Sequence, residues 1–316
     1  MDINNPAAIL RLRERWQTRF LKAFTEGPKP LAEMLCQMED STDEIEVYDL
    51  LVKFPAFKKF AGNLTKDNMA FAQHRVRNEE WHDVVEVPRA NIERDKIGRY
   101  NNMFDMLGQA ARRHPDALLA ETLAASFATT DYTGTNFYAA NKPHIPGVVD
   151  AQTFTNLMTE KPSAASFEKA SQLLAYIKDA TGQPMNVGGK KMVVCSDKWG
   201  STFRKILKAE TIAEVVTGEG AVSVANIYAG AADLAVFSYL NTAANQDKWF
   251  VLDMSWPLRS FIYQSEVKPR FIAQDNDKDE PCFTRHVNVY QGYYRGNIGL
   301  GLPQLSIGST GADAAL

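Results

Sequence analysis

Five histidines are the side chains in this sequence best suited to metal ligation or to proton transfer near neutral pH. They lie in separate segments of the chain: His74, His82, His114, His144 and His286. A zinc peptidase site needs two histidines four residues apart on one helix face, and the sequence contains no HExxH. The histidines therefore predict neither a metal site nor a catalytic base, and we expect no cofactor.

The three cysteines, Cys36, Cys195 and Cys282, are far apart and form no CxxC pair. A disulfide framework or a zinc site would need paired spacing, so the pattern favours small, buried apolar side chains in a reducing compartment. Cys195 precedes Ser196 and Asp197, but a nucleophilic cysteine also needs a nearby histidine to activate it. The sequence places no histidine there.

Two further motifs have a resemblance to ligand-binding loops. Gly218 and Gly220 could begin a dinucleotide-binding GxGxxG, but Ser223 occupies the position of the third glycine, which favours a simple loop. A run of acids follows later in the chain: Asp275, Asp277, Asp279 and Glu280. Because this run lacks the central glycine and the closing glutamate of a calcium loop, it predicts a solvated turn. The sequence therefore favours a protein that is not an enzyme.

Composition limits the possible partners. The chain has 316 residues and a net charge of −3, without an evident basic stripe, so we expect no sequence-specific reader of DNA. Contact with nucleic acid along one face stays compatible with this charge. No apolar run reaches the roughly 20 residues of a membrane span, and the N-terminal residues lack the apolar region of a secretory signal. We expect a protein of cytosol-like conditions without a membrane partner.

An amphipathic helix is predicted over residues 7–25. Its apolar residues fall largely on one stripe, with most of the arginines outside it: Ile9, Leu10, Trp16, Phe20, Leu21 and Phe24. This stripe needs a covering surface, which is either the rest of the same chain or a neighbouring subunit. Trp16 and Phe20 are therefore candidates for inter-subunit contact.

Residues 38–90 predict a hairpin with a long connection. The β-like runs 45–52 and 81–87 flank a polar and basic middle segment, and long loops of this kind are usually functional or lie against another surface. The candidate contact residues of this region are Phe54, Phe57, Phe60, Arg75, Arg77 and Trp81. Packing of the phenylalanines on the chain's own body is the alternative.

The remaining chain predicts a long helix followed by an α/β region. Apolar spacing indicates a helix over 93–113, and Pro115 either kinks it or begins a second helix. Alternating helices and strands follow: a helix at 167–180, a strand at 191–196, a helix at 199–209, and apolar runs at 233–240 and 249–254. Two alternating segments, 260–274 and 283–297, predict a final hairpin with a charged tip. The Gly- and Ser-rich tail from Gly299 is expected to be frayed.

Three stretches of the sequence resemble one known family. They are VKFPAFKKFAGN at 52–63, the run at 87–123, and YTGTNFYAANKPH at 132–144. In this order and approximate spacing they are similar to the major head subunit of Mu-like phages and prophages, the gpT family. The third stretch ends in Asn141-Lys142-Pro143-His144, where the family pattern is more acidic. The resemblance runs over most of the chain and is strongest from about residue 50 to 145.

The resemblance implies an α+β fold of the Hong Kong 97-type capsid class. Its expected parts are an N-terminal arm (1–45), an extended β-hairpin loop (46–92), a peripheral domain with a long spine helix (93–165 and 255–316) and an axial α/β domain (166–254). A modest net charge suits a coat around DNA, since each added phosphate contact strengthens binding.

The function implied by the resemblance is that of a major capsid protein. It would self-assemble as hexamers and pentamers into an icosahedral shell around double-stranded DNA held without sequence specificity, with portal and scaffold proteins as partners. It would be found in the virion capsid, after assembly in the host bacterial cytoplasm. Two alternatives stay open: a cellular encapsulating shell of the same fold, and an α/β enzyme with a nucleotide-binding domain at 166–254.

Overall fold

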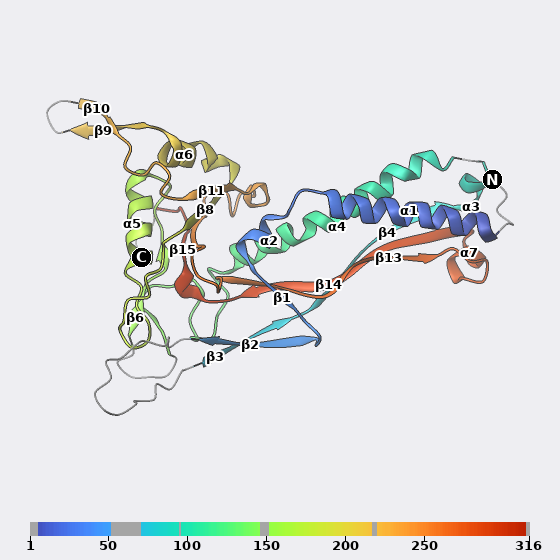
Figure 1. The fold of residues 1–316 in the computed structure, drawn as a ribbon, viewed down its shortest axis with the longest axis horizontal. Helices are drawn as coiled ribbons and strands as arrows, with labels where there is room; N and C mark the ends of the chain where they lie inside the picture. The colour runs from blue at the N-terminus through green and yellow to red at the C-terminus, as the bar shows by residue number, and fades with distance from the viewer. Residues whose placement is uncertain (1–5, 52–70, 95, 146–151, 217–219, 314–316) are drawn as a thin grey trace, which may run out of the picture.

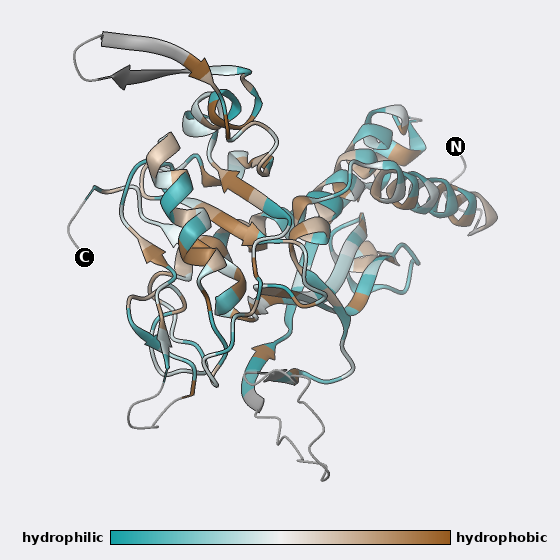
Figure 2. Ribbon diagram, turned by 60° about the vertical axis from the view of Figure 1, so that its left-hand side comes forward, coloured by the Kyte–Doolittle hydropathy of each residue, from teal (hydrophilic) through white to brown (hydrophobic). Residues whose placement is uncertain are grey.

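The computed structural model describes residues 6–51, 71–94, 96–145, 152–216 and 220–313. The described chain forms a long limb joined to a thicker body (Figure 1). The limb consists of two long helices lying on one face of a four-stranded sheet. The body surrounds a five-stranded sheet whose strands are strongly hydrophobic (Figure 2).

Helix α1 (Pro6–Glu26) forms where the amphipathic stripe predicts it. Its inward side chains Trp16 and Phe20 have no exposed surface. The Trp16 ring stacks on Phe104 with ring centroids 4.7 Å apart, and it meets the edge of Tyr290 at 4.9 Å. The Trp16 indole Nε1 donates to Asn101 Oδ1 at 3.2 Å. The chain's own limb therefore covers the stripe, so Trp16 and Phe20 are not available to a second subunit in this structure.

Helix α4 (Gly98–Ala125) is one continuous helix of 28 residues, about 42 Å long since each helical residue rises ~1.5 Å. Pro115 lies buried inside it, which excludes one of the two alternatives given for this residue, a second helix beginning there. The two long helices approach closely at Gly108, where an added Cβ would lie 2.4 Å from the Phe20 carbonyl oxygen. Only glycine allows this separation of the backbones.

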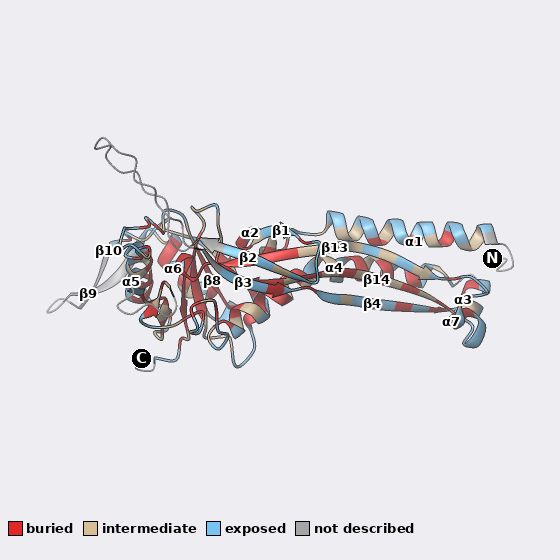
Figure 3. Cartoon of the chain, turned by 90° about the horizontal axis from the view of Figure 1, so that it is seen from below, coloured by how far each residue is buried: buried red, intermediate tan, exposed pale blue. Residues whose placement is uncertain are grey.

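The limb sheet has the order β1 (Gln37–Asp40), β13 (Phe261–Gln274), β14 (Val287–Leu300), β4 (Glu79–Pro88). Along most of β14, burial alternates residue by residue, as expected for a strand with one covered face. The helices cover that face, and the other is open to solvent except near Gly299, where Val76 packs on it (Figure 3). Strands β13 and β14 pair antiparallel, which agrees with the predicted final hairpin.

The sequence predicted that 45–52 and 81–87 pair with each other, and this pairing is wrong. Strand β2 (Ile45–Leu51) pairs antiparallel with β3 (Phe71–Arg77), whereas β4 pairs with β14, some 200 residues further along the chain. The sequence around 74–77 is polar because one face of β3 is exposed, and this polarity resembled that of a loop. A strand with one solvent-exposed face tolerates arginine on that face.

The charged tip predicted between β13 and β14 is only partly solvated. It holds the short helix α7 (Glu280–Thr284), and Asp275 is buried beside Arg13 of α1, with Nη1 and Oδ1 3.2 Å apart. Burial raises the pKa of Asp275, and the Arg13 charge opposes that rise. Asp277 in turn meets Arg89 of α3 (Arg89–Glu93) at 2.6 Å. These two ion pairs thus hold the acidic run against α1 and α3 at the end of the limb farthest from the body.

The body sheet is mixed, with strands from four parts of the chain. Its order is β11 (Asp233–Val236), β8 (Lys191–Cys195), β12 (Trp249–Asp253), β15 (Ser306–Ser309), β7 (Leu157–Met158). The other elements are α2 (Leu31–Leu35), α5 (Ala164–Ala175), α6 (Asp197–Lys208), the paired strands β9 (Thr211–Val216) and β10 (Gly220–Ala225), β5 (Lys142–Pro143) with β6 (Thr153–Phe154), and two 3-10 turns, Ser238–Leu240 and Pro303–Leu305.

The C-terminal tail is not frayed where the structure describes it. Strand β15 is buried along its whole length and lies between β12 and β7. An added Cβ at Gly308 would lie 2.8 Å from the Tyr138 ring, so the small residues of the tail permit close packing. The expected axial region 166–254 therefore shares its sheet with β7 and β15, which lie outside those bounds.

Trp16→Ala tests whether the arm stabilises its own subunit. Removing a fully buried tryptophan should lower the free energy of unfolding of the unassembled subunit by about 3–5 kcal/mol, measured by chemical denaturation. Gln17→Ala, at the exposed neighbouring position, should change it by less than about 0.5 kcal/mol. A Trp16→Ala subunit as stable as the wild type but defective in assembly would instead place this contact between subunits.

Candidate subunit interface

The β2–β3 hairpin presents one exposed face that combines apolar and cationic side chains. Ile45 and Val47 are 48% and 45% exposed, and they lie opposite Arg77 and Arg75 in the strand register. Arg77 Nη2 is 2.9 Å from Glu44 Oε1, both largely exposed. Apolar side chains flanked by arginine are the combination enriched in protein interfaces.

The opposite face of this hairpin is fixed to the limb sheet. Val76 is buried against Gly299, where an added Cβ would lie 2.2 Å from a Val76 methyl group. The Tyr48 hydroxyl donates to Gln264 Oε1 at 3.0 Å, and Gln264 Nε2 donates to Asn78 Oδ1 at 2.7 Å. The base of the hairpin is therefore rigid, while its outer face is available for contact.

The structure brings together only some of the predicted contact residues. Arg75 and Arg77 share the exposed hairpin face, beside Ile45 and Val47, which sequence reasoning missed although their alternate spacing was a usable signal. The other candidates are placed elsewhere: Trp16 and Phe20 are buried under α1, Trp81 points into the limb, and Phe54, Phe57 and Phe60 lie outside the described residues. The role of these three phenylalanines stays a prediction.

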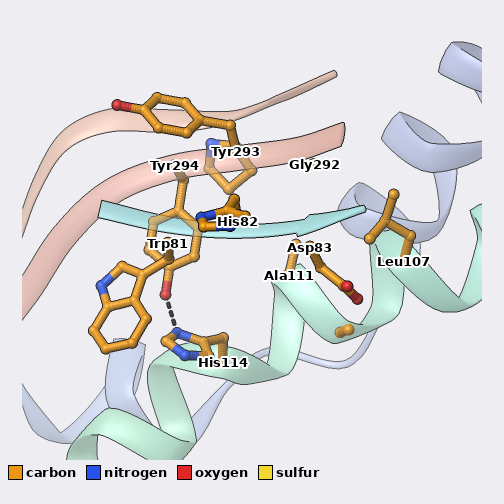
Figure 4. A pocket seen from close by; sticks show the side chains of 11 residues that line it. Trp81, His82, Asp83, Leu107, Ala111, His114, Gly292, Tyr293 and Tyr294 are labelled. Carbon is orange, nitrogen blue, oxygen red and sulfur yellow. Dashed lines mark hydrogen bonds between the residues drawn. The ribbon is translucent and has the colours of Figure 1, made fainter. Parts of the chain in front are cut away.

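Trp81 lines a pocket between α4 and the limb sheet, together with His114, Tyr294 and Leu107 (Figure 4). Its ring centroid is 4.5 Å from that of His114, and its Nε1 donates to the Gly296 carbonyl at 3.0 Å. His114 Nδ1 and the Tyr294 hydroxyl form a hydrogen bond. Burial lowers the pKa of His114 and raises that of Tyr294, so both are neutral near pH 7. This neutral pair acts as packing between helix and sheet.

The family-like stretch 132–144 lies around a buried ion pair. Lys142 Nζ is 2.5 Å from Asp131 Oδ2, and the two side chains are 0% and 1% exposed. Lys142 also donates to the carbonyls of Asn136 and Phe137, at 2.8 and 3.2 Å. Asp131 Oδ1 accepts from the amide and hydroxyl of Thr133, at 2.9 and 2.6 Å. Burial lowers the pKa of Lys142, and the Asp131 carboxylate opposes this shift.

His144 closes the same stretch and is 1% exposed. Its ring lies on Phe154 with centroids 4.7 Å apart, and its Nδ1 is 3.4 Å from Gln304 Nε2. Burial lowers the pKa of His144 to about 4, with a smaller opposing effect from the Asp179 charge. The imidazole is therefore neutral at pH 7 and serves as packing.

The candidate catalytic groups acquire no catalytic partners in the described part of the chain. Cys195 is buried, and burial together with the Asp197 charge raises its pKa to about 12, which disfavours the nucleophilic thiolate. Gly220 begins β10 and pairs with Val216 of the antiparallel strand β9, so it does not lie at a strand-to-helix turn; Gly218 lies outside the described residues. No group of three or more possible metal ligands gathers among the described residues. No described helix has the length and hydrophobicity to span a membrane.

The fold defines the class of protein. A procapsid structure of bacteriophage JBD30 contains a chain with a TM-score of 0.60 at 23% identity, covering 99% of this chain and 77% of that one. The mature capsid of bacteriophage PhiM1 gives 0.55 at 10% identity, covering 89% and 87%. A virus-like particle from Pyrococcus furiosus gives 0.54 at 9% identity, covering 94% and 98%. The fold is therefore the Hong Kong 97-type capsid fold, as the sequence resemblance implied.

Sequence comparison then gives the family. The model of the Mu-like prophage major head subunit gpT matches residues 9–167 and 226–313, and the chain belongs to this family. The major capsid protein of Escherichia phage Mu is 28% identical over 146 residues, which is 46% of this chain and 48% of the relative. The Mu-like prophage FluMu major head subunit of Haemophilus influenzae is 27% identical over 39% of this chain and 40% of the relative. The matched segments span less than half the length of either relative.

The buried ion pair of Lys142 and Asp131 should stabilise the fold only when both charges are present. Lys142→Met should lower the free energy of unfolding by about 3–5 kcal/mol, because it leaves the Asp131 carboxylate buried without its cation. The double variant Asp131→Asn/Lys142→Met should recover part of that loss, and Lys29→Met, at an exposed position, should have little effect. Chemical denaturation measures all three. A single variant no less stable than the double would show that the two charges are not coupled.

His144 should make the subunit less stable in acid. Its pKa is lower in the folded chain than the ordinary value near 6.5, so the unfolded chain binds a proton more readily as pH falls. The stability that depends on the neutral ring is complete above about pH 6.5 and declines toward pH 4, by about 3 kcal/mol at pH 4.

Denaturation of the unassembled subunit between pH 7 and pH 4 tests this effect of His144. His144→Gln should be less sensitive to acid than the wild type, whereas His82→Gln, at an exposed position, should follow the wild-type curve. Parallel curves for the wild type and His144→Gln would contradict the assignment.

Proposed function

We propose that this chain is a major head subunit that self-assembles, as hexamers and pentamers, into the icosahedral shell of a Mu-like tailed phage or prophage. The observation that carries the proposal is membership of the gpT family over most of the chain. The capsid fold matched over 99% of the chain supports it. The proposed shell encloses double-stranded DNA without sequence specificity, in the virion capsid.

The proposed partners follow from this role. Copies of the same chain are the first, and portal and scaffold proteins are further partners during assembly in the bacterial cytoplasm. The exposed face of the β2–β3 hairpin is the best described surface for contact between copies, because Ile45 and Val47 are apolar, exposed and held on a rigid base. The predicted contributions of Phe54, Phe57 and Phe60 belong to the segment joining these strands.

Two other functions fit the observations less well. A cellular encapsulating shell would share the fold, as does the Pyrococcus furiosus particle, but the family match is to phage head subunits. The α/β enzyme has no supporting observation in the described residues, since Cys195 is buried and Gly220 lies in an antiparallel strand pair.

Electron microscopy of the purified protein tests the assembly proposal. The wild type should form closed shells, rings or tubes, and Ile45→Glu/Val47→Glu should remain folded but fail to form them, because the charges would oppose burial at the interface. Ile45→Val/Val47→Ile keeps the apolar surface and should assemble normally. Circular dichroism of each variant separates loss of assembly from loss of fold.

One result would contradict the capsid function, and another would contradict only the assignment of the interface. A wild-type protein that stays a small soluble oligomer with bound nucleotide would favour the enzyme. Shells formed by the double glutamate variant would remove the hairpin face from the interface, while leaving the capsid function intact.

A further inference from the structure

Two rows of exposed polar side chains run along the outer surfaces of α1 and α4. On α1 the exposed row is Arg11, Arg15, Thr18 and Lys22; on α4 it is Arg99, Asn102, Met106, Gln109 and Arg113. Within each helix these residues are spaced three or four apart, which places them on one face. At ~1.5 Å per residue, the rows extend over about 17 and 21 Å.

The two rows belong to one continuous helical layer. Arg19 of α1 donates through Nε to Asp105 of α4 at 3.0 Å, and Gly108 lies against the Phe20 backbone, so the helices are in direct contact side by side. The opposite faces of both helices, with Trp16 and Phe104, are buried on the limb sheet. The rows therefore face away from the sheet, as the exposed outer surface of α1 in Figure 3 illustrates.

The charge of this layer differs in sign from that of the whole chain. The two rows contain five basic residues and no acidic one, in a chain with a net charge of −3. Glu14 and Glu26 border the α1 row, and Glu26 lies 3.9 Å from Lys22. The α3–α4 connection adds no net charge, because Arg94 and Lys96 alternate with Glu93 and Asp95 in the sequence. Because the cations of the two rows come from segments more than 70 residues apart, the sequence alone showed no basic stripe.

The open face of the limb sheet has a different electrostatic character. Its exposed acids include Glu80 and Glu86, which meet Arg295 and Arg285 at 3.4 and 2.8 Å. Cations on this face are thus largely matched by acids, whereas among the described residues only Lys22 of the two helical rows has a carboxylate partner.

We infer that the α1–α4 face binds the phosphate backbone of duplex DNA and hence faces the interior of the shell, an inference that rests on the proposed function. Arginine, lysine, threonine, asparagine and glutamine are the side chains that donate to phosphates. Met106 is the one apolar residue within the two rows. Exposed Leu10, Leu21 and Met103 lie on the same helices outside the rows, so the rows themselves lack the apolar centre of a protein interface. The five cations of the rows outnumber the two adjoining acids, Glu14 and Glu26, and this excess suits a polyanion bound without sequence readout.

The first test is the salt dependence of binding by the full-length, unassembled subunit. Fluorescence anisotropy with a labelled DNA duplex of mixed sequence gives the affinity at several salt concentrations. Arg99→Glu/Arg113→Glu should weaken binding by about tenfold or more and should reduce the salt slope by about 2, since each lost phosphate contact removes about one unit. Lys268→Glu/Arg270→Glu, at exposed positions of β13 outside the two rows, makes the same change in net charge and is the matched control.

The second test is the orientation of the face in closed shells. The three natural cysteines are buried, so a cysteine introduced at an exposed position is the accessible thiol for labelling. A maleimide-linked polyethylene glycol too large to cross the wall should label Gln274→Cys in closed shells. It should label Asn102→Cys only in unassembled subunits or disrupted shells.

Each outcome decides the inference. Equal loss of DNA affinity in the two charge-reversal variants would mean that only net charge matters, and labelling of Asn102→Cys in intact shells would place the helical face outside. Normal DNA binding by Arg99→Glu/Arg113→Glu together with failed assembly would assign the face to a protein partner, and would overturn the inference as well. If the wild type forms no shells, the proposed function fails, whereas the anisotropy experiment still tests the DNA-binding face.

Discussion

The close contact between α1 and α4 is the interaction on which the limb depends. At Gly108 the two backbones approach more closely than any residue with a Cβ would allow, and this approach brings the Trp16 ring onto Phe104. The aromatic pair then reaches Tyr290 of β14, so one cluster joins the two long helices to the sheet. Without it, the apolar faces of two helices and one sheet would be exposed to water.

This packing also explains why the limb has two chemically distinct faces. A sheet covered on one side alternates buried and solvent-facing residues, and β14 shows this alternation over most of its length. The helices that cover it must turn their polar sides outward. A thin, two-layer limb therefore has one helical surface and one sheet surface, which is the geometry of a wall element with an inner and an outer side.

Local pattern predicted much of this architecture. The stripe containing Trp16 and Phe20 predicted α1, and alternation predicted the hairpin of β13 and β14. What covers the stripe could not be predicted, because the covering residues Phe104 and Tyr290 lie 88 and 274 positions away in the sequence. The partner of β4 was missed for the same reason: its pairing with β14 is set by the packed sheet and not by neighbouring residues.

Composition misled where small or charged residues have packing roles. Gly308 suggested a frayed tail, yet the Tyr138 ring requires a residue without a side chain at that point of the body sheet. Asp275 suggested a solvated tip, yet it is buried and holds Arg13 of α1. In both cases the determining neighbour is distant in the sequence, so the residue type alone indicates the wrong environment.

The distribution of charge follows from the same pairing of distant segments. Arg13 and Arg19 of α1 are engaged by Asp275 and Asp105, which hold the helix in place along its length. Three other cations of the same helix are exposed: Arg11, Arg15 and Lys22. None of them pairs with a described carboxylate of the sheet, and Lys22 lies near Glu26 of its own helix. Fixing α1 with its inward-facing arginines thus leaves the remaining cations on the outer surface, next to those of α4. A single structural requirement, covering α1 with its own limb, both buries Trp16 within the subunit and leaves these cations on the outer surface.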